Sequence, residues 1–446
     1  MNVALIVLDT VRKDYFDEYA RRLRQNADVE FDRCYTPSTW TASAHASMAT
    51  GTLPHVHRVD AYSGDMSHLQ GDTFLSDISA DSICVSTNIN LNIRGFADFF
   101  DTARDPLFQA SAFVDSDLHI TDFLKKYDGD HTYLAYVYEA FRRRTLARSL
   151  LNGGIQKAYD VTGRLPPLKR RVDYGTECGI AAAKDALPDD DFFLFVNLME
   201  AHAPHQSMVD YDPDLIESVP NSWTSRHVPF SEINRDYESH AAHLDHFRDV
   251  YSASIEYLDR VVSEFVEDLT ERDTMVIVTS DHGENLGYPA EASVGHQVAK
   301  GSNSLAHVPL LLFNPPSEID TGLSSLIDVG DLVTGGLNDV LPDITCDRVA
   351  VERAGTGEPE DSLERWKGPK RVLYEDDRRW VWDTQQTLRE DLPIDLYEEE
   401  QGIPTERPQT SIFECTIEEY LQNARSDTEE LVTDDVKHRL EQLGYA

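Results

Sequence analysis

Side chains that can bind metal ions follow three strongly apolar stretches of the chain. The stretches are Asn2–Leu8, Phe192–Leu198 and Met275–Val278, and each has the composition of a buried β-strand. Because ligands bind at the carboxyl edge of the strands in open α/β sheets, the residues that follow these strands should lie close together. Those residues are Asp9, Glu200 with His202, and Asp281 with His282.

Carboxylates combined with an imidazole favour a divalent cation such as Ca²⁺, Mg²⁺, Mn²⁺ or Zn²⁺ over a thiolate site. Thr41 adds a hydroxyl, because the small residues that follow it, up to Gly51, predict a helix that begins near Thr41. The cation and the helix dipole would both stabilise the Thr41 alkoxide, which makes this residue a candidate nucleophile. The simplest hypothesis is one metal ion held by Asp9, Thr41, Asp281 and His282.

The remaining polar residues would act on the substrate. His202 is expected to bind the anion or to protonate the leaving group, and His296, Lys300 and His307 are expected to bind the substrate. A second metal ion would need further ligands, for which Glu200, His202 and His296 are the candidates. One metal ion is the simpler hypothesis.

Structural roles compete with these assignments. Asp9 could cap a helix, and Asp281 with His282 could form a polar turn after a strand. His307 opens an apolar strand, so it could be a structural histidine. His45 could pack on one face of the predicted helix or could lie beside the nucleophile.

The elements that position these residues predict a sheet covered on both faces. Ser82–Ser86 and His307–Phe313 have the composition of further strands, and the amphipathic pattern from His243 to Leu269 predicts a long helix. Nearly continuous apolar strands are typical of parallel sheets buried between two helical layers. We therefore expect an α/β/α sandwich with a mixed, mostly parallel central sheet.

The length of 446 residues suits a large α/β domain with an appendage. We expect a catalytic domain over residues 1–325, with a helical insertion at about 107–187. Residues 326–446 are expected to form a smaller C-terminal α+β subdomain. Within it, Arg371–Tyr374 and Arg379–Trp382 resemble a β-hairpin.

The composition is strongly acidic, with 80 acidic and 40 basic residues and a net charge of −40. The excess is spread over the whole chain, and such self-repulsion destabilises a compact state unless salt screens it. We therefore predict adaptation to a salt-saturated interior, as in extreme halophiles. Nucleic acid is disfavoured as a partner, because its recognition needs a basic surface.

Five widely spaced cysteines without a CxxC pair indicate a reduced, intracellular protein, and Cys34 is interpreted as structural. No apolar stretch reaches the roughly 18 residues of a membrane span. The first predicted strand starts at Asn2, with no basic segment or cleavage site before it. We expect a cytoplasmic location.

Several motifs together resemble the sulfatase family of the alkaline phosphatase superfamily. The resemblance spans most of residues 1–320 and touches the C-terminus at Leu440–Tyr445. It implies the α/β/α fold of that superfamily and a metal-dependent enzyme that acts on sulfate or phosphate esters of small molecules or glycans. The matching segments are Ile6–Thr10, Ser38–Gly51, Glu200–Pro204, Thr279–Glu284 and His307–Leu310.

The chain departs from the sulfatase pattern at the nucleophile. In the family the nucleophile stands nine residues before the threonine of a Thr-Gly pair, which here gives Thr41. True sulfatases carry Cys or Ser there, which becomes formylglycine, and Thr41 cannot be converted in this way. His45 replaces the family's arginine, and Thr10 replaces the second of two consecutive aspartates.

A threonine nucleophile resembles nucleotide pyrophosphatases and lipoteichoic-acid-synthase-like enzymes, which act on phosphoesters. The resemblance therefore implies a sulfatase-like hydrolase with Thr41 as its nucleophile. The alternatives are a phosphodiesterase or a phosphoglycerol- or phosphoethanolamine-type transferase of the same superfamily. A protein that has kept the fold and only binds anions or glycans is a further alternative, motivated by the changes around Ser43 to His45.

Overall fold

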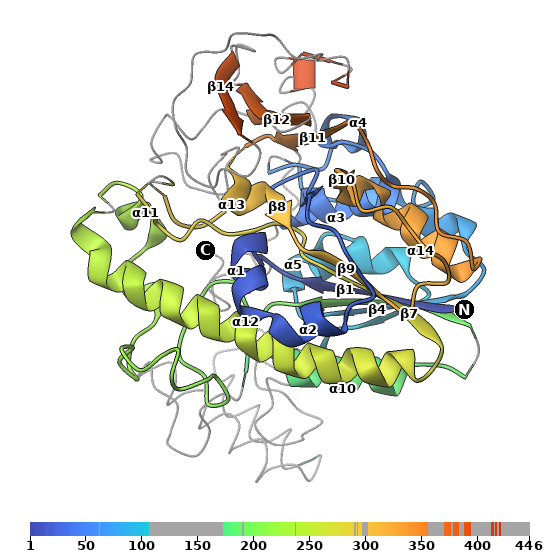
Figure 1. Cartoon of the computed structure of the whole chain (residues 1–446), viewed down its shortest axis with the longest axis horizontal. Helices are drawn as coiled ribbons and strands as arrows, with labels where there is room; N and C mark the ends of the chain where they lie inside the picture. The colour runs from blue at the N-terminus through green and yellow to red at the C-terminus, as the bar shows by residue number, and fades with distance from the viewer. Residues whose placement is uncertain are drawn as a thin grey trace.

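The computed structural model describes residues 1–106 and 173–355, except residues 62, 190, 237, 290, 292 and 297–301. It also describes residue 142, the ranges 370–375, 378–382 and 388–393, and six residues between 412 and 420. Within these ranges the largest element is a seven-stranded sheet (Figure 1). Its order is β2 (Val29–Glu30), β9 (Leu310–Phe313), β7 (Thr274–Thr279), β1 (Asn2–Leu8), β6 (Phe192–Leu198), β4 (Asp81–Ser86) and β5 (Thr102–Arg104).

The centre of this sheet is parallel. Strand β1 pairs in parallel with β7 on one side and β6 on the other, whereas β9 runs antiparallel to β7. The register pairs Val7 with Asn197 and with Thr279, so the three central strands end level with one another. This alignment brings the residues that follow the three strands to one edge, as the sequence predicts.

Strand β1 is buried on both faces because alternate side chains enter different cores. Ala4, Ile6 and Leu8 lie in one core, whereas Val3, Leu5 and Val7 lie in the other. Helices cover each face and complete the predicted three-layer sandwich (Figure 1). One layer comprises α1 (Lys13–Tyr19), α2 (Arg21–Asn26), α10 (Thr176–Ala186) and α12 (Ala241–Thr270), and the other comprises α3 (Thr41–Thr50), α5 (Ile89–Ile93) and α14 (Val329–Leu337).

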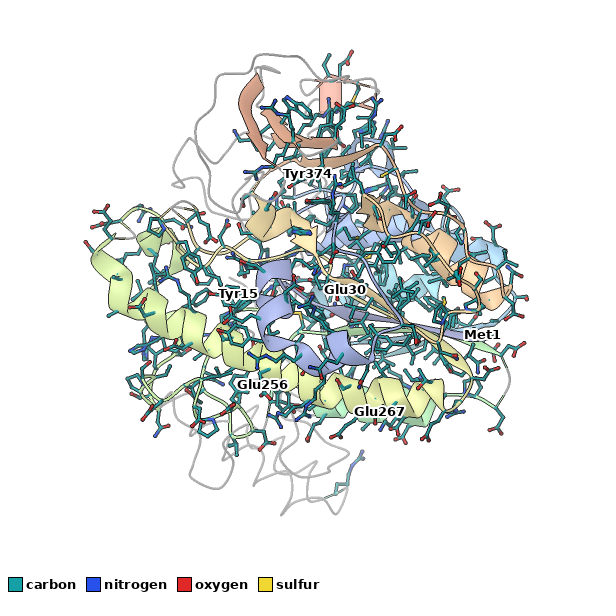
Figure 2. All side chains as sticks on the ribbon, in the orientation of Figure 1. Met1, Tyr15, Glu30, Glu256, Glu267 and Tyr374 are labelled. Atoms are coloured by element: carbon teal, nitrogen blue, oxygen red, sulfur yellow. The ribbon has the colours of Figure 1, made fainter. Side chains whose placement is uncertain are left out.

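Helix α12 confirms the amphipathic pattern that predicts it. Its apolar residues, among them Tyr251, Ile255 and Leu258, are buried against the sheet. Its other face carries acidic side chains, of which Glu256 and Glu267 are labelled in Figure 2. Across the described ranges, every helix is either too short or too polar to cross a lipid bilayer.

Two smaller sheets lie outside the main one. A three-stranded sheet joins β10 (Ser324–Ser325), β3 (Cys34–Tyr35) and β8 (His307–Val308). The prediction of one strand over His307–Phe313 is therefore wrong, because the segment divides at Pro309 into β8 and β9, which belong to different sheets. Proline has no backbone N–H to donate, so a ladder is easily interrupted there.

The third sheet is antiparallel and comprises β11 (Arg348–Arg353), β12 (Lys370–Glu375), β13 (Arg378–Trp382) and β14 (Leu388–Pro393). Strands β12 and β13 form the predicted hairpin.

Helix α14 lies beyond the predicted boundary at residue 325 and packs on the main sheet, so that boundary stays a prediction. Most of the predicted insertion, residues 107–141 and 143–172, lies outside the described residues.

Candidate active site

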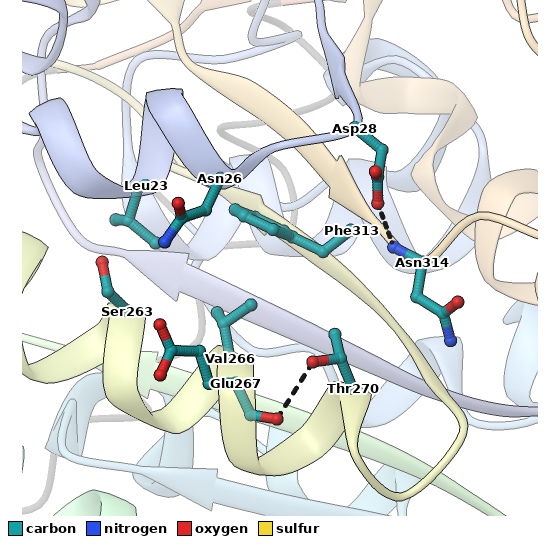
Figure 3. Close-up of a pocket in the computed structure, with 9 residues that line it drawn as sticks. All are labelled: Leu23, Asn26, Asp28, Ser263, Val266, Glu267, Thr270, Phe313 and Asn314. Carbon is teal, nitrogen blue, oxygen red and sulfur yellow. Dashed lines mark hydrogen bonds between the residues drawn. The ribbon is translucent and has the colours of Figure 1, made fainter.

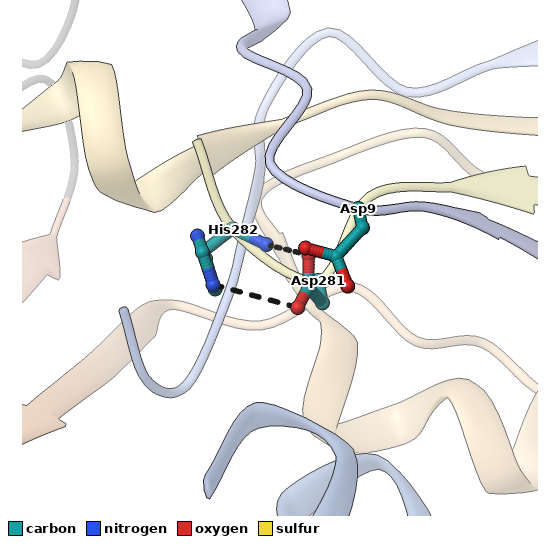
Figure 4. Close-up of side chains that lie close together, drawn as sticks. All are labelled: Asp9, Asp281 and His282. Carbon is teal, nitrogen blue, oxygen red and sulfur yellow. Dashed lines mark hydrogen bonds and ion pairs between the residues drawn. The ribbon is translucent and has the colours of Figure 1, made fainter. Parts of the chain in front are cut away.

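Asp9, Asp281 and His282 meet at the carboxyl edge of the main sheet. Asp9 follows β1 and the other two follow the neighbouring strand β7. Each residue offers one ligand atom, and these atoms lie within 4.8 Å of one another (Figure 4). All three side chains are fully buried. The structure thus brings together three of the four predicted metal ligands around one point.

Asp281 has one oxygen that is held by the backbone and one that has no hydrogen-bond donor. Its Oδ1 accepts hydrogen bonds from the backbone N–H of Thr10, at 3.1 Å, and of His282, at 2.9 Å. Its Oδ2 is buried without a hydrogen-bond partner. Burial raises the pKa of Asp281, while the nearby His45 lowers it. An unsatisfied buried carboxylate oxygen is costly, so this atom indicates a missing positive partner.

Asp9 shows the same division. Its Oδ2 accepts hydrogen bonds from the side-chain amides of Asn88, at 2.8 Å, and Asn197, at 3.2 Å. Its Oδ1 is buried without a hydrogen-bond partner. Asn88 follows β4 and Asn197 lies within β6, so the two strands beyond β1 orient this carboxylate. The alternative role of Asp9 as a helix cap is therefore not the one that the structure shows.

His282 is prepared as a neutral ligand. Burial, reinforced by the charge of His296, lowers the pKa of His282 to about 3. Its Nδ1–H donates to the carbonyl of Gly283 at 2.8 Å, which directs the lone pair of Nε2 toward Thr41 and Asp281. A neutral imidazole fixed by an outer hydrogen bond is the form that binds metal ions. Two unpartnered carboxylate oxygens and this nitrogen therefore fit a divalent cation.

Thr41 lies at the start of α3, as predicted, with its Oγ1 3.1 Å from Nε2 of His282. The side chains from Thr41 to Ala49 are all buried, which small residues permit, and the helix ends at Gly51 in the left-handed region at φ 65°. Anionic oxygens are stabilised at a helix N-terminus by the helix dipole and by backbone N–H groups without partners. The position of Thr41 therefore suits a nucleophilic alkoxide.

His45 lies one turn further along α3. Its Nδ1–H donates to the carbonyl of Thr41 at 2.8 Å, and its ring contacts Phe96 and Phe195 edge-on. Burial lowers the pKa of His45, so a neutral ring stands where the resemblance implies an arginine. The residue packs in the core and also lies beside the cluster, with Nδ1 3.8 Å from Oδ2 of Asp281.

Gly283 allows the chain to leave β7 in the required direction. A Cβ atom at this position would lie 2.0 Å from the carbonyl oxygen of Ser304, in α13 (Asn303–Ala306). The backbone N–H of Gly283 donates to the carbonyl of Leu305 at 2.8 Å. Any side chain would push this loop away from α13 and displace His282.

His202 and His296 lie beside the cluster, as predicted for residues that act on the substrate. The ring centroid of His296 lies 4.5 Å from that of His282 and 5.1 Å from that of His202. The Nδ1–H of His202 donates to the carbonyl of Ala203 at 2.5 Å. The Nδ1–H of His296 donates to the carboxylate of Glu284 at 3.1 Å, and burial raises the pKa of that carboxylate to about 7.

Glu200 is turned away from the cluster. Its carboxylate accepts hydrogen bonds from the hydroxyls of Tyr211 and Thr176 and from the backbone N–H of Tyr174. Burial raises the pKa of Glu200 to about 8. With these three donors Glu200 has a structural role, and among the described residues the ligand atoms that gather closely are those of Asp9, Asp281 and His282.

His307 has structural contacts. Its Nε2–H donates to the carbonyl of Asp32 at 2.8 Å, and its ring stacks on Tyr35 with centroids 4.8 Å apart. These contacts join β8 to β3, so the structural alternative accounts for them, and a substrate contact of His307 stays a prediction. Lys300 lies outside the described residues.

Sequence reasoning missed the residues that hold the predicted ligands in place. Asn197 is a lone polar residue in an apolar strand, and Asn88 follows the predicted strand at Ser82–Ser86. Both positions are visible in the sequence and could have been proposed as residues of the site. Glu284 directly follows the Asp-His-Gly segment. Thr10 has a positive φ of 63°, and its backbone N–H bonds Asp281 while its hydroxyl bonds the carbonyl of Ala201. No sequence pattern indicates this geometry of Thr10.

A separate pocket lies at the opposite end of the strands. It is lined by α2, α12 and the end of β9, and its lining residues include Asn26, Glu267 and Asn314 (Figure 3). The side-chain amide of Asn314 donates to the carbonyl of Thr274, the first residue of β7. The pocket therefore contains none of the residues predicted to do chemistry.

Comparison with known proteins agrees with this geometry. Residues 177–333 match the sulfatase family, and no curated protein matches the chain in sequence. A phosphonate monoester hydrolase from Silicibacter pomeroyi is similar in structure, with a TM-score of 0.55, 15% identity and coverage of 87% of each chain. A 2-O GAG sulfatase has a TM-score of 0.55 and 11% identity, and the alignment covers 88% of this chain and 85% of that one.

A third solved structure was determined in complex with its substrate D-glucosamine-2-N,6-O-disulfate. It has a TM-score of 0.53 and 12% identity, and the alignment covers 87% of this chain and 90% of that one. At these identities the solved structures show a shared fold. The family match extends from α10 to α14 and includes the Asp281–His282 pair. Residues 177–333 are therefore similar to the sulfatase family, and the chain shares the fold of solved sulfatase and phosphonate monoester hydrolase structures.

Proposed function

We propose that this chain is a metal-dependent hydrolase of sulfate or phosphate esters with Thr41 as its nucleophile. One observation carries the proposal: the Thr41 hydroxyl, the neutral His282 and two unpartnered carboxylate oxygens meet at one buried point. A divalent cation held by Asp9, Asp281, His282 and Thr41 would supply positive charge to stabilise the alkoxide and the anionic ester. A protein that only binds anions would not need this combination.

Thr41 and the N-terminus of α3 have separate roles in the proposed reaction. Thr41 loses its proton to solvent, and its Oγ1 forms a bond to the sulfur or phosphorus of the ester while the bond to the leaving oxygen breaks. The N-terminus of α3 stabilises negative charge at Thr41 in both the alkoxide and the transition state. Water then cleaves the Thr41 ester and restores the hydroxyl.

The leaving oxygen departs with its electron pair and needs a proton. The ring centroid of His296 lies 4.5 Å from that of His282 and 5.1 Å from that of His202, and either His202 or His296 could supply this proton. We assign the role to His202. The Nδ1–H of His296 is committed to Glu284, which fixes this ring in position to contact the anion.

The substrate is proposed to be a sulfate or phosphate ester of a small molecule or glycan. Proteins with the same fold include a phosphonate monoester hydrolase, a 2-O GAG sulfatase and a protein bound to its disulfated glucosamine substrate, which supports a tetrahedral oxyanion ester. Phosphodiester hydrolysis, or transfer from Thr41 to an acceptor other than water, would use the same residues.

A substrate panel tests the proposal. The purified chain is loaded with Ca²⁺, Mg²⁺, Mn²⁺ or Zn²⁺ in concentrated salt and assayed with aryl sulfate, phosphate monoester, phosphodiester and phosphonate monoester substrates. Turnover of at least one ester that requires the metal and Thr41 is expected. If every ester were left intact under every metal, while the chain still took up a metal ion, the non-catalytic alternative would be favoured.

We also propose that the protein works in a salt-rich cytoplasm. The charge of −40 supports the salt adaptation, and the exposed face of α12 carries several of these charges, among them Glu264, Glu267 and Asp268. All five cysteines are free thiols, which supports a reducing compartment.

A further inference from the structure

Arg353 is a buried cation that reaches toward the active site from a different sheet. It ends β11 in the four-stranded sheet and is only 2% exposed. Its Nη1 donates to the carbonyl of Thr39 at 2.9 Å, and its Nε donates to the carbonyl of Gly355 at 3.2 Å. Thr39 precedes the nucleophile Thr41 by two residues, so the guanidinium lies next to the segment that leads into α3.

The outer nitrogen of this guanidinium, Nη2, is buried without a hydrogen-bond partner. The hydrogen bonds that Arg353 forms with described residues go to backbone carbonyls, while Asp60 and Tyr420 act on it electrostatically. Burial accordingly lowers the pKa of Arg353 to about 10. A buried guanidinium nitrogen without a hydrogen-bond partner is costly, and the oxygen of an anion would satisfy it.

Arg371 in the neighbouring strand β12 is also buried, but it is paired with a carboxylate. Its Nε forms an ion pair with Glu352 at 2.7 Å, and its Nη1 donates to the carbonyl of Cys415. Both arginines are almost fully buried, yet the hydrogen bonds of Arg353 go to carbonyls, and the ring of Trp40 lies 5.6 Å from its Cζ. The difference is the carboxylate that is hydrogen-bonded to Arg371.

The guanidinium of Arg353 also lies beside Trp40, the residue directly before the nucleophile, with its Cζ 5.6 Å from the ring centroid. The contacts with Thr39 and Trp40 therefore place this cation at the start of α3, next to Thr41.

We propose that Arg353 is a substrate-binding residue whose Nη2 receives an oxygen of the sulfate or phosphate group of the bound ester. This inference rests on the proposed function and adds to it a ligand contributed by the four-stranded sheet. A guanidinium matches the geometry of a tetrahedral oxyanion and forms strong charge-assisted hydrogen bonds with it. The substrate oxygen would thus satisfy the buried nitrogen that the fold leaves without a hydrogen-bond partner.

The competing role is a purely structural one, in which Arg353 only fastens Thr39 to the four-stranded sheet. Anion binding separates the two roles. The experiment measures the affinity of the metal-loaded protein for inorganic sulfate and inorganic phosphate by calorimetry, together with kcat and KM for the best ester, at one fixed chloride concentration. The variants are Arg353→Met, Arg353→Lys and, as a matched control, Arg348→Met at the other end of β11.

Arg353→Met is expected to weaken binding of the inorganic anion about tenfold or more, and to raise KM by a similar factor with a smaller change in kcat. Arg353→Lys should fall between Arg353→Met and the native protein, and Arg348→Met should bind the anion as the native protein does. Should Arg353→Met fail to fold, Arg353→Lys decides alone. Anion affinity within twofold of the native value in the folded variants would overturn the proposal.

Two further outcomes keep this inference separate from the proposed hydrolysis. A native protein that turns over an ester while Arg353→Met binds and acts unchanged would overturn this inference alone. A native protein that turns over no ester, yet binds the inorganic anion through Arg353, would overturn the hydrolysis alone. An effect seen only with esters whose leaving group is itself charged would overturn the assignment to the sulfate or phosphate group.

Discussion

The Thr41 hydroxyl lies 3.1 Å from Nε2 of His282, although 241 residues separate the two along the chain. Helix α3 supplies the hydroxyl and the loop after β7 supplies the imidazole. The tautomer of His282 is fixed by Gly283, so the hydroxyl is the donor in this hydrogen bond. The pair therefore joins the proposed nucleophile directly to a proposed metal ligand.

Thr41→Val should abolish turnover while the fold is kept. Valine has nearly the shape of threonine, so the packing of α3 is preserved and only the hydroxyl is lost. We expect kcat to fall by a factor on the order of a thousand or more, because removal of a nucleophile has effects of that size. Steady-state kinetics and thermal unfolding of the same samples measure both quantities.

Thr41→Ser is the matched control, since it keeps the hydroxyl and loses only a methyl group. It should retain much of the activity. If Thr41→Val kept more than a tenth of the native kcat, Thr41 would not be the nucleophile.

The metal-ligand cluster could be predicted from sequence because strand ends are readable. Asp9, Asp281 and His282 each follow an apolar run, and parallel strands place such residues at one edge. The orientation of the side chains could not be read in the same way. Glu200 follows an equally clear strand, yet it turns toward Tyr211 because three donors gather there.

The division of His307–Phe313 into two strands and the position of Arg353 could not be predicted from the sequence for a second reason. Both depend on pairing between segments far apart in the chain, such as His307 with Tyr35 and β11 with β12. Apolar composition predicts that a strand exists, but not which sheet it joins. Pro309 was the local feature that could have indicated the break.

Removing the metal ion should destabilise the native chain but not Asp281→Asn. Asp9 and Asp281 each have an unpartnered buried oxygen, and without a cation these charges are desolvated and repel. Asparagine keeps Oδ1 as the acceptor for the backbone N–H of Thr10 and removes the charge. We expect chelation to lower the Tm of the native chain and to leave that of the variant unchanged.

In the chelated state the variant should be the more stable of the two proteins. Thermal unfolding with chelator and with added metal ion, at one salt concentration, gives the four values needed. Equal responses of the two proteins to chelation would show that the cation does not bind at Asp281.

His57 should make the protein less stable as the pH falls below about 6.5. Its Nδ1 accepts a hydrogen bond from the backbone N–H of Val59, and its Nε2–H donates to Ser47. Burial lowers the pKa of His57 to about 3, while the unfolded chain titrates near 6.5. Between these values the unfolded state binds more protons than the folded state. The free energy of unfolding therefore decreases as the pH is lowered, and this group contributes at most about 1.4 kcal/mol per pH unit.

His57→Asn tests this contribution, because Asn can accept from Val59 and does not titrate. The variant should lose some stability at pH 7.5 and then show a shallower decline between pH 6.5 and 4. Urea unfolding at several pH values measures the difference. Parallel curves for both proteins would mean that His57 is protonated in the folded state.

Concentrated salt should stabilise the fold. The net charge is −40, and on α12 the exposed residues Asp245, Glu264, Glu267 and Asp268 place like charges on one face. The Debye length falls from about 10 Å at 0.1 M salt to about 3 Å at 1 M, which removes most of this repulsion. Tm should therefore rise steeply with KCl and much less with a neutral osmolyte. A Tm that is independent of KCl would contradict the proposed salt adaptation.

The division of labour between His202 and His296 should appear in the leaving-group dependence. If His202 donates the proton to the leaving oxygen, His202→Gln should slow esters of basic alcohols by about a hundredfold or more and barely affect esters of acidic phenols. His296→Gln should instead raise KM for all esters alike, since this ring is fixed by Glu284 beside the anion. The measurement is kcat/KM against the pKa of the leaving group for the native chain and both variants. A steeper slope for His296→Gln than for His202→Gln would exchange the two roles, and the Glu284–His296 pair would then carry the proton.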